Sequence, residues 1–198
     1  MAAEMNNKKI FGGRKMKKFG VKSVVATAIL AALVFVMIRF IAIPTPLPNT
    51  TLSIYAAVSA FFAVVFGPVV GFLGTFIGDL LVDVTAGWGI WWSWIIPTGL
   101  YGLLMGLGCK KINLEDGEFG KKEIIQFIAV SFICCAICWG LLCPLFDILF
   151  YAEPAGKVFA QGACVGLSGF VSTAVIGTLI CKAYAATRSK KGSLKKED

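Results

Sequence analysis

Apolar residues in this chain fall into long continuous runs, and short polar segments separate them. A run of about 20 apolar residues is long enough to cross the hydrocarbon core of a bilayer as a helix. The pattern predicts an all-α integral membrane protein built as a bundle of six transmembrane helices. The expected helices cover residues 23–43, two parts of 52–82, 91–108, 124–144 and 158–186.

The run 52–82 is interrupted at Gly67-Pro68, which predicts a helix break. Each half is short for a membrane span, so two thin spans and a re-entrant hairpin both remain open. Glycines at helical spacing follow the break and predict close packing against a neighbouring helix; they are Gly71, Gly74 and Gly78. Asp79 and Asp83 are expected to end this helix.

Three polar segments interrupt the remaining runs. IPTPLPNTT (43–51) alternates prolines, so we expect an extended, stiff loop that suits a lid or acts only as a helix breaker. Residues 110–123 are expected to form a solvated loop, and 147–157 a polar break. The predicted organisation is a basic segment 1–22, a membrane domain 23–186 and a basic tail 187–198.

The charges are distributed asymmetrically. The formal net charge is +8, and all but two of the 19 Lys and Arg residues fall in 1–22, 110–123 or 182–198. The exceptions are Arg39 and Lys157. The positive-inside rule therefore predicts a multi-pass protein of the cell membrane with both termini cytoplasmic. It also explains the basic charge by the lipid bilayer, so no nucleic-acid partner is expected.

This orientation places the proline loop, the Trp-rich segment 79–94 and the 147–157 break on the outer side. The Trp-rich segment, DLLVDVTAGWGIWWSW, holds four of the five tryptophans. Carboxylates within an apolar segment are costly, and they usually face a cavity or a partner. A small-molecule site at the outer mouth is one interpretation, and an interfacial aromatic belt is the other. The gathered residues are Arg39, Asn49, Asp79, Asp83, Trp88, Trp91, Trp92, Asp147 and Glu153.

Other chemistry finds little support in the sequence. The chain has no histidine and no Walker A sequence, so a histidine-activated nucleophile and ATP hydrolysis by that route are excluded. Cys135 and Cys138 form a single C-x-x-C within an apolar run, which favours packing over metal or redox chemistry. We therefore predict no catalytic residues, no metal site and no cofactor.

The order of these features resembles the substrate-binding S components of energy-coupling factor (ECF) transporters, riboflavin type. The resemblance covers about residues 20–186 and is carried by the Ala28/Ala32 pair, IPTPLPNTT, FGPVVGFLGTFIGDLL and GWGIWWSW. It implies a non-enzymatic subunit that captures a vitamin-like compound from outside. The implied partners are a membrane T component, on which Ala28 and Ala32 dock, and two ABC ATPases, which hydrolyse ATP.

In such families the loops after the first, third and fifth helices line or close the site, here 44–51, 84–90 and 147–157. Riboflavin, which the family label favours, would stack on Trp88, Trp91 or Trp92 and hydrogen-bond to Asn49, Asp79 or Gln161. Cobalamin and a deazapurine precursor of queuosine also suit an aromatic, polar mouth. With Asp83 and Asp147, these residues form the expected substrate-binding set. An integral membrane enzyme acting on lipid-linked substrates and a proton-coupled carrier are the alternatives from other classes.

Overall fold

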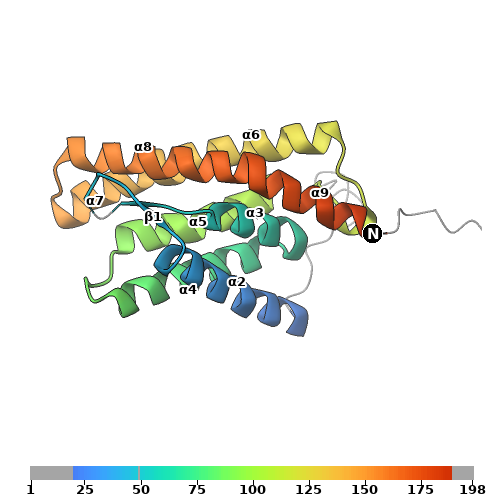
Figure 1. Cartoon of the computed structure of the whole chain (residues 1–198), viewed down its shortest axis with the longest axis horizontal. Helices are drawn as coiled ribbons and strands as arrows, with labels where there is room; N and C mark the ends of the chain where they lie inside the picture. Colours follow the sequence, from blue (N-terminus) through green and yellow to red (C-terminus); the bar gives the residue numbers. More distant parts are fainter. Residues whose placement is uncertain (1–19, 49, 189–198) are drawn as a thin grey trace, which may run out of the picture.

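The computed structural model describes residues 20–48 and 50–188, and the described chain is mainly helical. Six helical segments run along the molecule (Figure 1). They are α2 (Val21–Arg39), α3 (Tyr55–Phe66), α4 (Pro68–Ala86), α5 (Trp92–Gly108), the continuous α6–η2–α7 (Lys121–Ile137, Cys138–Leu142, Cys143–Tyr151) and the continuous α8–η3–α9 (Ala155–Ser172, Thr173–Gly177, Thr178–Ala186). The expected all-α, six-helix membrane fold is confirmed.

Four of the described helical segments are long and apolar enough to cross a membrane, namely α2, α4, α6–α7 and α8–α9. The 12 residues of α3 extend for only about 18 Å, which is short of the roughly 30 Å hydrocarbon core. Ten of those 12 residues are buried. The helix is therefore enclosed by protein, while α4 after the Gly67-Pro68 break has the length of a full span.

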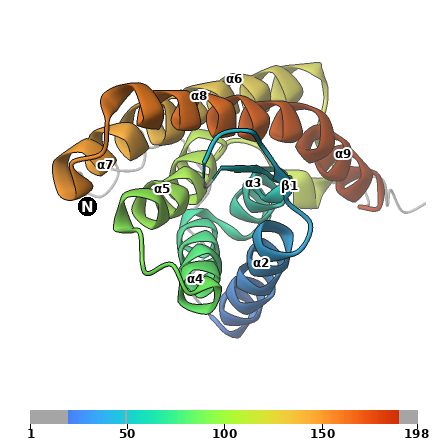
Figure 2. The ribbon, with the colours of Figure 1, turned by 60° about the vertical axis from the view of Figure 1, so that its left-hand side comes forward.

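The helices form two layers with α3 between them. The long helices α6–α7 and α8–α9 lie side by side in one layer, and α2, α4 and α5 form the other (Figures 1 and 2). Helix α3 contacts α2, α4, α5, α8 and η3, so it joins both layers. Many large apolar side chains point outward from the bundle, as expected where lipid replaces water.

Glycines allow α4 to pack closely against both neighbours, which confirms the prediction from their spacing. A Cβ on Gly74 would lie 2.5 Å from Leu30 of α2, and one on Gly78 would lie 2.7 Å from the Ala31 carbonyl oxygen. On the other side, a Cβ on Gly102 of α5 would overlap the backbone of Gly71. Packing at this range replaces the hydrophobic driving force that helices lack inside a bilayer.

The fifth helix was predicted too short. It was expected to end near Pro144, with Asp147 in a polar break, but α7 continues to Tyr151. A π-helical turn, η2, precedes the proline and accommodates the backbone hydrogen bond that proline cannot donate. The helix ends at Ala152, which adopts a left-handed conformation (φ 51°). Asp147 therefore lies on a helix inside the bundle.

Other boundaries also differ from the predicted ones. Helix α2 ends at Arg39 rather than at Ile43. Ile43 precedes Pro44, which favours extended backbone, and Ile43–Pro44 (β1) pairs antiparallel with Thr51–Leu52 (β2). Helix α4 continues past Asp83 to Ala86, where Gly87 caps it with φ 82°. Helix α8 begins at Ala155, one residue after Pro154.

The close approach of α4 and α5 predicts an asymmetric effect of adding single methyl groups. Gly102→Ala should destabilise the protein by about 1–3 kcal/mol, because the new methyl group meets the Gly71 backbone. Gly156→Ala is the matched control, since its Cβ would have no neighbour within 4 Å. Thermal unfolding in detergent measures both variants. Equal unfolding temperatures for the two would contradict the proposed packing.

Candidate functional site

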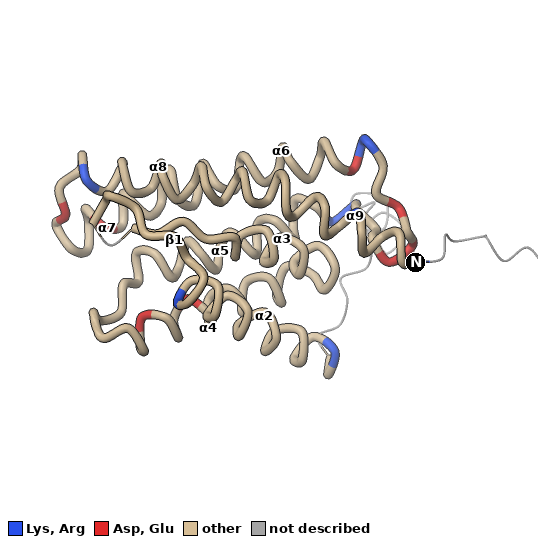
Figure 3. The backbone as a smooth tube through the Cα atoms, in the orientation of Figure 1, with Lys and Arg blue, Asp and Glu red and all other residues tan. Residues whose placement is uncertain are grey.

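The two ends of the bundle differ in charge. One end, called the rim here, contains the β1–β2 hairpin, the 87–91 turn between α4 and α5, and the 152–154 turn between α7 and α8. Figure 3 shows most described Lys and Arg residues at the opposite, basic end. These are Lys22, Lys110, Lys111, Lys121, Lys122, Lys182 and Arg188. Among the described residues, only Arg39 and Lys157 place cationic side chains toward the rim.

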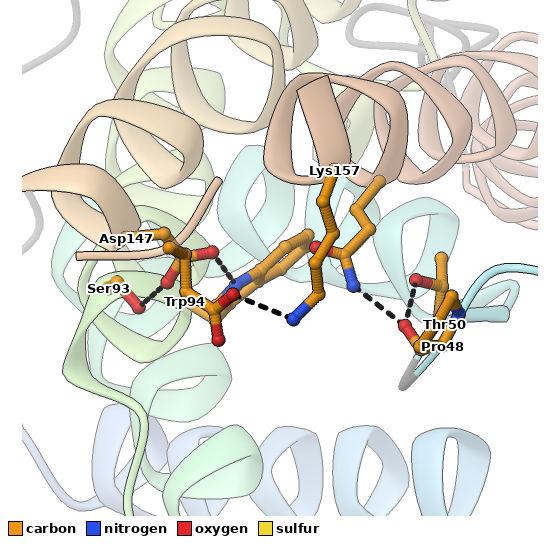
Figure 4. A network of polar contacts seen from close by, with 8 residues as sticks. Pro48, Thr50, Ser93, Trp94, Asp147 and Lys157 are labelled. Atoms are coloured by element: carbon orange, nitrogen blue, oxygen red, sulfur yellow. Dashed lines mark hydrogen bonds and ion pairs between the residues drawn. The ribbon is translucent and has the colours of Figure 1, made fainter. Parts of the chain in front are cut away.

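Asp147 joins α7 to the start of α5. Its Oδ1 accepts a hydrogen bond from the Ser93 hydroxyl, and its Oδ2 accepts one from Trp94 Nε1 at 2.8 Å (Figure 4). The carboxylate is buried, with 2% of Asp147 exposed. A buried charge persists only where such donors satisfy it. Because both oxygens are engaged, Asp147 positions the Trp94 indole within the rim.

Asp83 holds the turn that follows α4. Its Oδ1 accepts a hydrogen bond from Trp88 Nε1 at 3.0 Å, and its Oδ2 accepts one from the Trp91 backbone N–H at 2.8 Å. Gly87 and Gly89 have φ values of 82° and 91°, which side chains rarely tolerate, so the turn needs glycine at both positions. Asp83 thus shapes the turn from which the tryptophans project.

The tryptophans of this turn do not converge on one point. Trp91 packs on Tyr151 with ring centroids 4.6 Å apart, and the Tyr151 hydroxyl donates to the Ile90 carbonyl oxygen and accepts from the Trp92 N–H. Trp92 is stacked with Phe76 at 6.4 Å and is 43% exposed. Trp88 is 57% exposed. Trp91 is therefore the best enclosed of the three predicted ring platforms.

A side chain of α8 hydrogen-bonds to the hairpin. Gln161 Nε2 donates a 2.7 Å hydrogen bond to the Pro48 carbonyl oxygen, and Thr50 Oγ1 donates to the same oxygen at 2.9 Å. Gln161 is 5% exposed. Lys157 of α8 forms a 2.8 Å ion pair with Glu153, and in Figure 4 its ammonium group turns away from Pro48 and Thr50 of the hairpin. The stiff proline loop therefore covers one side of the rim.

Asp79 lies one helical turn before Asp83 on the same face of α4; Asp83 is buried and Asp79 is half-buried. Its carboxylate interacts with the side-chain hydroxyl of Thr98 on α5. Tyr55, the first residue of α3, interacts with both groups. Three helices therefore bring polar groups together below the 87–91 turn.

The structure joins some of the predicted site residues and separates others. At the rim, Asp83, Asp147 and Gln161 are buried and Asp79 and Trp91 are half-buried, whereas Trp88 and Trp92 are exposed. Asn49 lies outside the described residues. The sequence did not predict which side chains contact the candidate residues, because the local sequence does not show contacts with distant residues. The side chains not predicted are Tyr55, Ser93, Trp94, Thr98 and Tyr151.

Comparison with known proteins assigns this arrangement to a family. Residues 18–186 match the family described as "ECF-type riboflavin transporter, S component", and the chain belongs to that family. Its similar relatives include a UPF0397 protein of Lactococcus lactis subsp. cremoris (49% identity; 93% of this chain, 98% of the relative) and one of Streptococcus pneumoniae (47% identity; 91% and 98%). The family consists of membrane transporter subunits, not enzymes.

Solved structures show the same fold at low identity. A crystal structure of FolT bound with folic acid has 21% identity and a TM-score of 0.61, over 85% of this chain and 96% of FolT. A structure of ThiT from Listeria monocytogenes has 15% identity and a TM-score of 0.58, over 84% and 94%. At these identities the likeness concerns the fold alone.

Asp147 should be needed for stability because of its two donors. Asp147→Leu keeps the approximate size of the side chain but removes both acceptor oxygens, so Trp94 Nε1 and the Ser93 hydroxyl lose their buried partner at a cost of about 1–3 kcal/mol. Thermal unfolding in detergent should show a lower midpoint. Glu118→Gln, an exposed acid at the basic end, is the matched control and should leave the midpoint unchanged. A midpoint for Asp147→Leu equal to that of the wild type would contradict this role.

Proposed function

We propose that this chain is the substrate-binding subunit of an ECF-type importer. It captures a vitamin-like small molecule at the outer face of the cell membrane, and riboflavin is the favoured ligand because the family carries that name. The observation that carries the proposal is the gathering of buried and half-buried carboxylates with the Trp91 and Trp94 rings at the rim of a bundle from this family. The candidate binding residues are Asn49, Asp79, Asp83, Trp88, Trp91, Trp92, Asp147 and Gln161.

The orientation rests on the charge asymmetry. Seven of the nine described Lys and Arg residues lie at the basic end, and cytoplasmic loops carry such an excess. In this orientation both termini are cytoplasmic and the rim opens outward. The hairpin over the rim then acts as the lid that admits the ligand.

The transport energy is supplied by partner subunits in this proposal. A T component in the membrane and two ABC ATPases complete the importer, and the S component docks on the T component through α2. Ala28 and Ala32 support this role because both are exposed on the face of α2 opposite its packed residues. Small side chains on an exposed helix face allow another helix to approach closely.

Ligand binding by the purified chain tests the function directly. We expect the chain to retain or bind one compound from a panel of riboflavin, cobalamin and a deazapurine, identified by absorbance and mass spectrometry and titrated by calorimetry. Trp91→Ala should weaken that binding by about 1–3 kcal/mol if the indole stacks on the ligand. Trp91→Phe, which keeps an aromatic face, should lose less. A folded chain that binds no vitamin-like compound would refute the proposal.

If the chain docks on the T component through α2, substitutions on α2 should affect assembly with the T component but not ligand binding. Ala28→Trp or Ala32→Trp should abolish copurification with the T component, because an indole keeps the helices apart, while ligand affinity remains at the wild-type value. Ala183→Trp, the same change at an exposed position of α9, is the control and should assemble normally. Joint loss of assembly and ligand binding in the α2 variants would mean that these alanines support only the fold.

A further inference from the structure

The end of α7 and the start of α8 form one braced corner, residues 147–161, at the rim. Only residues 152–154 separate the two helices. The Glu153 backbone N–H donates to the Asp147 carbonyl oxygen at 3.3 Å, and the Glu153 carboxylate pairs with Lys157 at 2.8 Å. Contacts on both sides of the turn therefore hold the two helix ends together as one rigid piece.

The α7 side of this corner holds the 87–91 turn through Tyr151. The Tyr151 hydroxyl accepts a hydrogen bond from the Trp92 backbone N–H at 3.2 Å and donates one to the Ile90 carbonyl oxygen at 3.3 Å. It therefore bonds to the backbone on both sides of Trp91, while the Trp91 indole packs on the Tyr151 ring. One side chain of α7 thus fixes both the backbone and the indole at this position.

The α8 side of the corner holds the hairpin through Gln161. Gln161 Nε2 donates to the Pro48 carbonyl oxygen at 2.7 Å, close to the tip of the hairpin. The hairpin is also braced internally, because the Thr45 hydroxyl and the Thr45 N–H both donate to the Thr50 carbonyl oxygen, at 2.8 Å and 3.1 Å. A braced loop attached near its tip can move as a whole when that attachment is released.

The corner is the element that these two loops share. In the described part of the chain, no hydrogen bond joins the hairpin to the 87–91 turn. Both loops hydrogen-bond to the corner instead, where Asp147 also accepts from the first turn of α5. Figure 4 shows contacts of the corner in one row, with Ser93 at one end and Thr50 at the other.

These contacts cross the boundary between the two layers of the bundle. The corner belongs to the layer of α6–α7 and α8–α9, whereas the hairpin follows α2 and the 87–91 turn follows α4 of the other layer. Loops that are held by few hydrogen bonds open at a low free energy, and such loops commonly control access to binding sites. A movement of the rigid corner would release both loops at once.

We infer that the α7–α8 corner is a clasp that opens the rim as one unit, with Tyr151 and Gln161 as its positioning residues. The hairpin and the 87–91 turn then open together when the corner moves away from α5, and the hairpin does not lift by itself. The inference rests on the proposed function, because the clasp controls access to the site that the function requires.

Thiol labelling at a buried hairpin position measures the opening without any ligand. Thr50 is 5% exposed, so the rate at which a water-soluble maleimide labels Thr50→Cys in the purified full-length chain reports how often the hairpin opens. Tyr151→Phe keeps the ring that packs on Trp91 but loses both hydrogen bonds of the hydroxyl, which hold the turn and not the hairpin. Added to Thr50→Cys, it should still raise the labelling rate roughly 2- to 10-fold, the range that the loss of a hydrogen bond gives.

Control variants separate coupled opening from simpler effects. Gln161→Leu removes the contact of the hairpin itself, so it should raise the labelling rate of Thr50→Cys whether or not the loops are coupled. Leu149→Ala alters an exposed side chain on the same helix as Tyr151 and should leave the rate unchanged. Mass spectrometry should show that Tyr151→Phe does not accelerate labelling of the native, buried Cys109 at the basic end.

An unchanged labelling rate of Thr50→Cys on addition of Tyr151→Phe would overturn the clasp, because the hairpin would then open independently of the turn. An unchanged rate on addition of Gln161→Leu would overturn it as well, since the clasp requires that contact. Faster labelling of Cys109 in Tyr151→Phe would mean that the variant loosens the whole fold, which also contradicts the inference. All three outcomes leave the proposed function standing, because the ligand panel tests that function separately.

Discussion

The hydrogen bonds that indole and backbone N–H groups donate to Asp147 and Asp83 hold the rim of this bundle together. Inside a membrane neither carboxylate could rely on water, so each must find donors within the protein. Asp147 fixes α7 against the first turn of α5, and Asp83 fixes the turn between α4 and α5. The same two interactions orient Trp94, Trp88 and Trp91, so the shape of the candidate site follows from satisfying buried charge.

The packing beneath the rim permits this arrangement. Gly71 and Gly102 bring α4 and α5 into backbone contact, and Gly74 and Gly78 bring α4 against α2. Helix α3, enclosed between the layers, contributes Tyr55 to the interior close to Asp79 and Thr98. The close helix packing at the glycines and the buried helix α3 therefore bring the polar side chains of α3, α4 and α5 together at the rim.

The sequence predicted the features that follow from local patterns, namely the helices and their glycine spacing. It did not predict features that depend on contacts between distant residues. Long apolar runs and flanking lysines are local properties, so six helices and the spacing of Gly71, Gly74 and Gly78 were predicted correctly. Pro144 misled the boundary of the fifth helix, because a π-helical turn absorbs the missing hydrogen bond only once the helix is packed. The 147–157 segment was for this reason taken as a polar break, although Asp147 lies on a helix.

The sequence predicted that the candidate site residues gather at one end of the bundle, and the structure places most of them there, but it did not predict their partners. Density of tryptophan and acid near residues 79–94 pointed to the rim. The sequence did not show that Trp92 stacks on Phe76. It also did not show that Asp147 accepts hydrogen bonds from Ser93 and Trp94, which lie more than fifty residues earlier in the chain. Those pairings are set by tertiary packing, which a single sequence does not contain.

Sidedness is the most direct test of an S component that captures its ligand from outside. Single cysteines can replace exposed residues at each end, Ile90 at the rim and Lys111 at the basic end, with the wild type as background for its own thiols. A membrane-impermeant maleimide should label Ile90→Cys in intact cells and Lys111→Cys only after the cells are opened. The reverse pattern would place the rim in the cytoplasm and contradict uptake of an external ligand.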